Sequence, residues 1–265
     1  MPLSAEDLYQ RLLTADTASL LVMFDYDGTL VPIAPTPAQA RPSDRLMQRL
    51  TRLADSDIMA AVVSGRALAD LRALLPVPGL WLAGEHGGVV RKPGGEERWA
   101  VSPEAATPAL SQLQALTVPI IAQAPGFFLE RKRLSLALHY RLAAPHLARN
   151  VVRAVQQFWA AHARRHALAL LTGKCVLEVR CQGVDKGAAC RLLMREAPGA
   201  VALYVGDDTT DEDAFQVVAA AGGLTVVVGR SRPTSARYAL AGPAEVESLL
   251  ALLAMRAPAA TSGDP

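Results

Sequence analysis

The sequence predicts an α/β protein, in which a core with a doubly wound parallel sheet carries an inserted α+β domain. Three observations predict this fold. Short apolar runs that end in Gly, Asp or Ser recur along the chain, helical patterns lie between them, and a central stretch departs from this alternation. Apolar runs with no polar face need cover on both sides, as parallel strands do. Strands that alternate with helices predict βαβ units.

The core elements follow in chain order. We expect strands at residues 19–25, 58–64, 80–84, 201–207 and 224–229, because each is a short apolar run that closes on a small or acidic residue. We expect helices at residues 42–54, 67–75, 186–196, 211–221 and 244–255, where the pattern is helical.

The central stretch has a different pattern. Strands expected at residues 127–130, 134–141 and 174–180 flank a helix expected at 146–166. We therefore predict an α+β domain at residues 108–182, inserted into a core of residues 1–107 and 183–265. Its boundaries fall near 102–108 and 182–184, where residues disfavour a continuing element. The tail at 257–265 has no apolar periodicity, so we expect it to be disordered.

Composition excludes several classes of protein. The chain has 265 residues, 51% of them hydrophobic, and a formal net charge of only +2, which gives no electrostatic basis for nucleic-acid binding. The three cysteines form no CxxC pair, which argues against a disulfide scaffold or a zinc ribbon. The apolar run at 20–24 is too short to span a bilayer. We expect a monomeric cytoplasmic protein that acts on a small molecule.

Two carboxylates follow the first strong strand. Asp25 and Asp27 stand in Asp-Tyr-Asp-Gly-Thr, with Gly28 allowing a sharp turn. A lone Asp-Gly is usually just a turn. Here, however, the acids lie at the carboxyl end of a predicted parallel strand, which is the edge where open α/β sheets bind their ligands.

A second acidic cluster follows the strand at 201–207. Carboxylates stabilise the start of a helix, but this accounts for one or two acids and not for the five between 207 and 213. A calcium loop is excluded, because its sixth position would be Glu212 instead of Gly and its twelfth Val218 instead of Glu.

The two acidic clusters would meet if their strands belong to one sheet. Asp25, Asp27, Asp207 and Asp208 would then converge at the carboxyl edge. Such a cluster of like charges is tolerable chiefly when a hard cation shares it, and Mg²⁺ is the natural candidate. A substrate phosphate would complete its coordination.

Two further residues suit phosphoryl transfer, which depends on positioning and on neutralising charge. Ser64, in Ser-Gly-Arg at the end of the second strand, offers a hydroxyl and nearby backbone N–H groups. Lys186, at the start of a helix, offers a positive charge. Taken alone, the first could be a turn and the second a solvated lysine.

These residues, in this order, resemble the four motifs of the haloacid dehalogenase superfamily of phosphatases: Asp25-Tyr-Asp27-Gly-Thr, Ser64, Lys186 and Gly206-Asp207-Asp208. The resemblance implies that Asp25 is the nucleophile and Asp27 the general acid/base. It also implies that the fourth motif holds Mg²⁺ and that the insertion is a cap domain over the substrate.

The chain also resembles the trehalose-6-phosphate phosphatases. The shared signatures are Gly84-Glu85-His86-Gly87, Glu130 with Lys132, His139-Tyr140-Arg141, Gly173-Lys174, Leu177-Glu178-Val179-Arg180, and Asp208 to Asp213. Cys181 departs from the family, which usually has proline there. The resemblance implies hydrolysis of trehalose 6-phosphate through an aspartyl-phosphate, as the last step of trehalose biosynthesis.

The predicted site residues fall into three groups. The catalytic ones are Asp25, Asp27, Ser64 and Lys186; those that bind substrate are Arg66, Glu85, His86, Lys132, Arg141, Lys174 and Glu178; and those that bind Mg²⁺ are Asp25, Asp27, Asp207, Asp208 and Asp211. The charged residues of the insertion could instead be solvated strand-face charges, and His86 could orient a loop instead of touching the sugar. Alternative functions are a phosphatase for sucrose 6-phosphate or mannosyl-3-phosphoglycerate and, from another class, an inactive phosphosugar-binding regulator.

Overall fold

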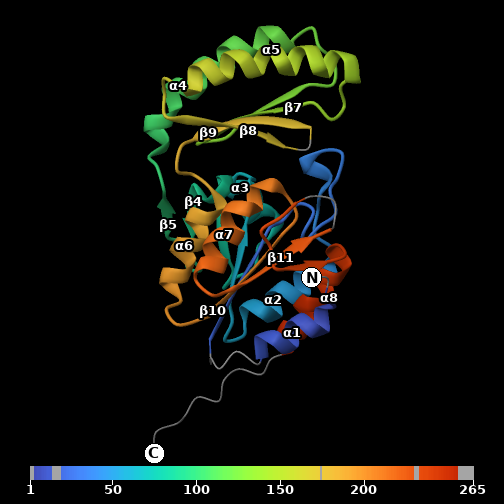
Figure 1. The fold of residues 1–265 in the computed structure, drawn as a ribbon. Coiled ribbons are helices and arrows are strands. Elements are labelled where there is room, and N and C mark those ends of the chain that lie inside the picture. The colour runs from blue at the N-terminus through green and yellow to red at the C-terminus, as the bar shows by residue number, and fades with distance from the viewer. Residues whose placement is uncertain (1–2, 14–18, 174, 230–232, 256–265) are drawn as a thin grey trace, which may run out of the picture. The chain divides into compact units, whose positions relative to one another are not determined.

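The computed structural model describes residues 3–13, 19–173, 175–229 and 233–255 (Figure 1). The chain divides into two compact units. The first comprises residues 1–98 with 185–265, and the second comprises residues 99–184. The expected tail at 257–265 lies outside the described residues.

The first unit is built on an eight-stranded sheet in the order β12-β11-β10-β1-β2-β3-β4-β5. Its strands are β1 (Leu20–Phe24), β2 (Met59–Val63), β3 (Trp81–Gly84), β4 (Val89–Arg91), β5 (Glu97–Trp99), β10 (Val201–Gly206), β11 (Leu224–Val228) and β12 (Tyr238–Leu240). The strands from β12 to β3 pair in parallel, whereas β4 runs antiparallel to β3. Every residue of β1 is buried, as the apolar runs predict.

Helices form two groups around this sheet (Figure 1). α6 (Lys186–Glu196) and α7 (Glu212–Ala220) pack on each other, and their apolar residues share a core with β1, β2 and β10. α1 (Ala5–Leu13) and α2 (Asp44–Ala54) pack on α8 (Pro243–Leu253), and α3 (Leu68–Leu74) contacts β3. Short 3-10 turns lie at Pro37–Gln39, Glu85–Gly87 and Thr209–Asp211. The predicted α/β fold with a doubly wound, mainly parallel sheet is confirmed.

Side chains define where two of these helices begin. Ser43 caps α2 by accepting a hydrogen bond from the backbone N–H of Leu46 at 3.1 Å. Asp185 caps α6 by accepting from the N–H of Ala188 at 2.6 Å. Each cap satisfies a donor that the first turn of a helix would leave unpaired, so α6 begins at Lys186.

The second unit is a four-stranded antiparallel sheet with two long helices. The strands are β6 (Phe128–Arg131), β7 (Ser135–His139), β8 (Leu168–Gly173) and β9 (Val176–Cys181), in the order β6-β7-β9-β8, and the helices are α4 (Pro103–Ile121) and α5 (Pro145–Ala163). Trp159 of α5 is fully buried, and its Nε1 donates to Thr117 Oγ1 of α4 at 2.9 Å. This unit therefore has its own core.

Helix α4 differs from the sequence-based prediction. α4 runs through Pro108, where the sequence predicts a break, and the predicted first boundary after residue 107 lies inside this helix. Ala106, Leu110, Leu113 and Thr117 recur on its buried face, and this packing outweighs the unfavourable proline.

Among the described helices, none is long and apolar enough to cross a membrane. The three cysteines are free thiols.

Candidate active site

The first strand delivers a buried carboxylate to the edge of the sheet. β1 ends at Phe24, and only 4% of the surface of the next residue, Asp25, is exposed. The backbone N–H of Asp25 donates to the carbonyl oxygen of Val205 at 2.8 Å, which holds it beside β10. Because burial disfavours a charged carboxylate, the pKa of Asp25 lies well above its ordinary value.

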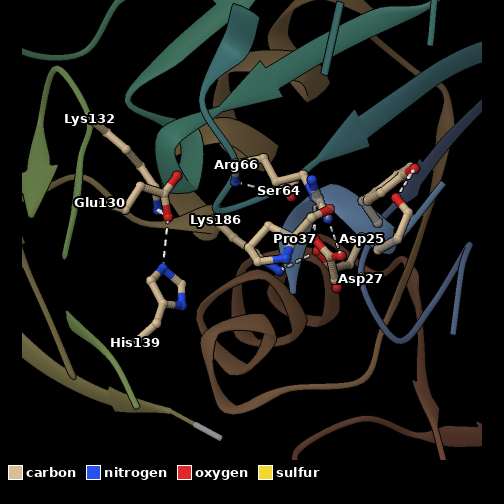
Figure 2. A network of polar contacts seen from close by, with 11 residues as sticks. Asp25, Asp27, Pro37, Ser64, Arg66, Glu130, Lys132, His139 and Lys186 are labelled. Carbon is tan, nitrogen blue, oxygen red and sulfur yellow. Dashed lines mark hydrogen bonds and ion pairs between the residues drawn. The ribbon is translucent and has the colours of Figure 1, made fainter. Parts of the chain in front are cut away.

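A buried lysine pairs with this carboxylate (Figure 2). Lys186 Nζ donates to Asp25 Oδ1 at 2.7 Å and to Asp211 Oδ1, also at 2.7 Å. Burial alone would lower the pKa of Lys186, but the carboxylates of Asp211 and Asp25 raise it above its ordinary value. Lys186 is thus a fixed positive charge beside Asp25.

Asp211 receives hydrogen bonds at both of its oxygens. Besides Lys186, the hydroxyl of Tyr204 donates to Oδ1 at 2.7 Å, and the backbone N–H of Asp208 donates to Oδ2 at 2.8 Å. Gly206 makes this approach possible, because a Cβ there would lie 2.3 Å from Asp211 Cγ. Asp211 therefore orients Lys186 and the turn that follows β10. Asp208 caps that turn.

The loops after β1 and β10 meet at a glycine. Gly28 has a φ of +88°, and a Cβ there would lie 2.3 Å from Asp207 Oδ2. Glycine is therefore required at residue 28 for two reasons. The left-handed backbone disfavours a side chain, and Asp207 fills the space where one would lie. Asp207 itself is buried, with 8% of its surface exposed.

Three buried carboxylates lie close enough together to hold one cation. One oxygen each from Asp25, Asp207 and Asp211 lies within 4.8 Å of the other two. Like charges this close in a poorly solvated site repel one another, and an all-oxygen donor set suits a hard divalent cation. Because Asp211 already accepts three hydrogen bonds, Asp25 and Asp207 are the better direct ligands.

Asp27 is held by an arginine. Arg66 donates from Nε to Asp27 Oδ2 at 2.6 Å and from Nη2 to Asp27 Oδ1 at 2.7 Å, and Nη2 also reaches the carbonyl oxygen of Pro37 at 2.9 Å (Figure 2). Its guanidinium lies 5.0 Å from the centre of the Tyr26 ring. Although burial alone would lower the pKa of Arg66, Asp27 raises it. Arg66, which the sequence analysis predicts to bind substrate, here pairs with Asp27, the predicted general acid/base.

The Ser64 loop lies beside these residues. The backbone N–H of Arg66 donates to the buried Ser64 Oγ at 3.2 Å. Glu85 and His86, which follow β3, are also buried, and their backbone N–H groups donate to the carbonyl oxygens of Arg66 and Ser64. The first unit thus brings the predicted motif residues together at the carboxyl edge of its sheet.

The second unit carries a separate polar network on one face of its sheet. Lys132 Nζ and Ser135 Oγ both donate to Glu178 Oε1, at 3.0 and 2.6 Å. His139 Nε2 lies 2.8 Å from Glu130 Oε2 (Figure 2). Burial alone would raise the pKa of Glu130, but the hydrogen bond from His139 and the charge of Lys132 lower it. Of the remaining predicted residues, Arg141 is exposed and Lys174 lies outside the described residues.

Comparisons with known proteins identify the family. A family model described as trehalose-phosphatase matches residues 23–244. The chain belongs to the trehalose-phosphatase family. It is thus a phosphatase, and the predicted family resemblance is confirmed.

Individual members of the trehalose-phosphatase family match most of the chain. It is 39% identical over 235 residues to the trehalose-6-phosphate phosphatase of Escherichia coli, covering 87% of this chain and 85% of that one. It is 38% identical to the trehalose-phosphate phosphatase of Mycobacterium avium over 88% of this chain but only 61% of that protein. A solved structure of the C-terminal domain of Candida albicans trehalose-6-phosphate phosphatase matches with a TM-score of 0.86 and 27% identity, covering 96% and 97% of the two chains.

Three residues that take part in the polar networks of the two units were not among the site residues predicted from the sequence. Tyr204 donates to Asp211, Ser135 to Glu178, and His139 pairs with Glu130. Tyr204 was missed because it lies in an apolar run, where the sequence indicates a core residue. Ser135 and His139 could have been found from the alternation of side chains along a strand, because both share a face of β7 with Ala137. Ala137 pairs with Glu130 on one side and with Glu178 on the other.

Proposed function

We propose that the chain is a magnesium-dependent phosphatase that hydrolyses trehalose 6-phosphate to trehalose and phosphate, with Asp25 as the nucleophile. One observation carries this proposal: a buried Asp25 is held between Lys186 and two further carboxylates at the carboxyl edge of the sheet. Family membership supports the same reaction, because relatives over most of the chain are named for that substrate.

Magnesium fits the donor set. We infer that Asp25 and Asp207 hold it through their side chains and Asp27 through its backbone carbonyl. Asp208 and Asp211, also predicted as ligands, support these residues without binding the ion directly. When bound, the cation neutralises charge on the phosphoryl oxygens and favours the ionised form of Asp25. That second effect matters because burial alone raises the pKa of Asp25.

The chain's own residues divide the reaction into two displacements. Oδ of Asp25 forms a bond to phosphorus as the bond to the sugar oxygen breaks, and Asp27 gives its proton to that oxygen. Water then attacks the aspartyl-phosphate, gives its proton to Asp27 and releases phosphate. Lys186 and Ser64 hold the phosphoryl oxygens. Since Arg66 occupies both oxygens of Asp27, we infer that it turns to the substrate phosphate and releases Asp27 for proton transfer.

The second unit is proposed to select the sugar. Trehalose presents many hydroxyl groups, which a site must pair with polar side chains. Glu130, Lys132 and Glu178 supply buried or half-buried charges on one face of the sheet, and Arg141 and Lys174 remain predicted contacts. In this proposal, the domain predicted at residues 108–182 acts as a substrate cap.

A substrate panel tests the proposal. Release of inorganic phosphate is measured with trehalose, sucrose and glucose 6-phosphates and with mannosyl-3-phosphoglycerate, each with magnesium and with chelator. We expect trehalose 6-phosphate to be the best substrate and chelator to abolish turnover. A preference for another ester would overturn the specificity, chelator-resistant activity would overturn the metal, and no release from any ester would favour the inactive regulator. The monomeric state, the cytoplasmic location and the absence of nucleic-acid and membrane partners remain predictions from the sequence.

A further inference from the structure

The turn after β3 has an unusual backbone. Residues 84–87, the 84–87 turn, follow the strand directly, and three consecutive residues have positive φ: Glu85 at 52°, His86 at 58° and Gly87 at 90°. Glycine adopts this conformation readily, whereas it is uncommon for other residues. Two non-glycine residues in succession remain there only when the surroundings require it, and such strain clusters at functional sites.

The two central residues of the 84–87 turn are hydrogen-bonded to the Ser64 loop. The N–H of Glu85 donates to the carbonyl oxygen of Arg66 at 2.7 Å, and the N–H of His86 donates to that of Ser64 at 2.9 Å. The N–H of Ser64 in turn donates to the carbonyl oxygen of Ala83 at 2.9 Å. The left-handed conformation directs two consecutive N–H groups at the loop that carries Ser64 and Arg66.

The ring of His86 occupies the space beside Gly65. A Cβ at residue 65 would lie 2.6 Å from both Cε1 and Nε2 of that ring. The φ of Gly65 lies outside the left-handed region, so its backbone would accept alanine. A side chain at residue 65 would therefore require the His86 ring to move.

The same turn also contacts the helix that carries Lys186. A Cβ at Gly87 would lie 2.7 Å from the carbonyl oxygen of Asp185, the cap of α6, and 2.8 Å from Ala189 Cβ. On its other side, a Cβ at Gly84 would lie 2.8 Å from the backbone nitrogen of Leu68, where α3 begins. The turn thus separates the start of α3 from the start of α6.

We propose that the 84–87 turn sets the position of the Ser64 loop relative to Lys186, and that His86 is a positioning residue that acts through Ser64. This inference rests on the proposed phosphatase function of the same site. Of the two roles that the sequence leaves open for His86, contact with the sugar or orientation of a loop, it assigns the second: the ring holds Gly65, so that the Ser64 hydroxyl faces the phosphoryl group.

A double-mutant cycle tests the contact between the ring and Gly65. Gly65→Ala creates the clash, and His86→Asn removes Cε1 and Nε2 while keeping a residue that tolerates the left-handed region. We expect Gly65→Ala to lower kcat/KM for an aryl phosphate by about tenfold to a hundredfold, because small displacements of catalytic groups have effects of that size. Gly65→Ala/His86→Asn should be more active and melt higher than Gly65→Ala alone. Additive losses would overturn the contact.

A second cycle tests whether His86 acts through Ser64. We expect His86→Asn to lower kcat severalfold in the natural background but to change it less than about twofold in a Ser64→Ala background, because the positioned hydroxyl is then absent. An equal loss in both backgrounds would assign His86 to another role. His146→Asn, at an exposed histidine, is the matched control.

Protection by inorganic phosphate separates this inference from the proposed function. Phosphate should raise the melting temperature of the natural protein, and His86→Asn should reduce that increment, whereas a merely structural histidine would lower the melting temperature and leave the increment intact. A protein that releases no phosphate from any ester but shows this pattern would refute the proposed function and retain the positioning role. Phosphatase activity with an unchanged increment would refute the positioning role alone.

Discussion

At the scale of single residues, a substitution of Asp25, the proposed nucleophile, is the most direct test. Asp25→Asn keeps an oxygen that can accept from Lys186, so the fold and phosphate binding should survive, but an amide cannot form the acyl phosphate. We expect phosphate release to fall about a thousandfold or more while the melting temperature stays within a few degrees. Turnover at several per cent of the natural rate would assign the nucleophile to another residue.

The same substitution should change how stability depends on pH. Burial raises the pKa of Asp25 above its ordinary value of 3.8, so the folded state binds more protons than the unfolded state as the pH rises above about 4. The free energy of unfolding therefore falls over that range, and Asp25→Asn removes this contribution. In chelator, the melting temperature of the variant minus that of the natural protein should be higher at pH 7 than at pH 4. A constant difference would contradict the raised pKa.

Arg66 allows a prediction that separates charge from geometry. Lysine keeps the positive charge but lacks the planar fork that engages both oxygens of Asp27 and that, in the proposed reaction, turns to the substrate phosphate. Arg66→Lys should lower kcat/KM by about tenfold to a hundredfold, and by the same factor for trehalose 6-phosphate and an aryl phosphate, because both present a phosphoryl group. The exposed Arg195→Lys is the control. A loss confined to the trehalose ester would place Arg66 at the sugar.

At the scale of elements, the polar face of the small sheet should determine sugar selectivity. Ala137 of β7 pairs with Glu130 of β6 on one side and with Glu178 of β9 on the other, so the two acids share one face of the sheet. Glu178→Ala should lower kcat/KM for trehalose 6-phosphate by about tenfold to a hundredfold and leave aryl phosphate hydrolysis nearly unchanged. Exposed Glu104→Ala, in the same unit, is the control. Equal losses on both substrates would remove Glu178 from the sugar site.

The sequence predicted the elements whose cause is local. Apolar runs such as Leu20–Phe24 are buried on both faces, so their pattern alone indicates a strand, with ends that differ by one residue. α4 was missed because its stability comes from contacts with Trp159 and the sheet, while its prolines oppose a helix locally. A propensity argument cannot weigh packing against a partner that is distant in sequence.

At the scale of the whole molecule, the meeting of distant motifs was predictable and their pairings were not. Parallel strands place their carboxyl ends at one edge, so Asp25 and Asp207 had to approach once both strands joined the sheet. The pairing of Arg66 with Asp27, and that of Tyr204 with Asp211, depends on rotamers and on loop paths. Spacing along the chain does not encode either of them.

Among the residues that the structure describes, each unit has a hydrophobic cluster whose buried members all belong to that unit. One core draws on strands and helices from Leu21 to Val90 and from Ala189 to Val227, and the other on residues between Ala106 and Val184. Arg98 is the last residue before the second unit, and its Nη1 donates to Glu196 Oε1 at 2.6 Å. Glu196 ends helix α6, which begins at Lys186. That 11-residue helix is about 16 Å long, so a flexible linker of about ten residues can join the two cut ends.

Replacing residues 99–184 by such a linker should leave a folded phosphatase without sugar selectivity. The first unit keeps its sheet, Asp25, Ser64, Lys186 and Asp207, so cooperative unfolding and magnesium-dependent hydrolysis of an aryl phosphate should persist, within about tenfold of the natural rate if the second unit mainly excludes water. The preference for trehalose 6-phosphate over the aryl ester should fall by about a hundredfold, because the side chains proposed to pair with the sugar are gone. Thermal unfolding and kcat/KM for both esters measure these outcomes. Loss of cooperative unfolding would show that the two cores depend on each other, and a retained preference for the trehalose ester would place sugar recognition in the first unit.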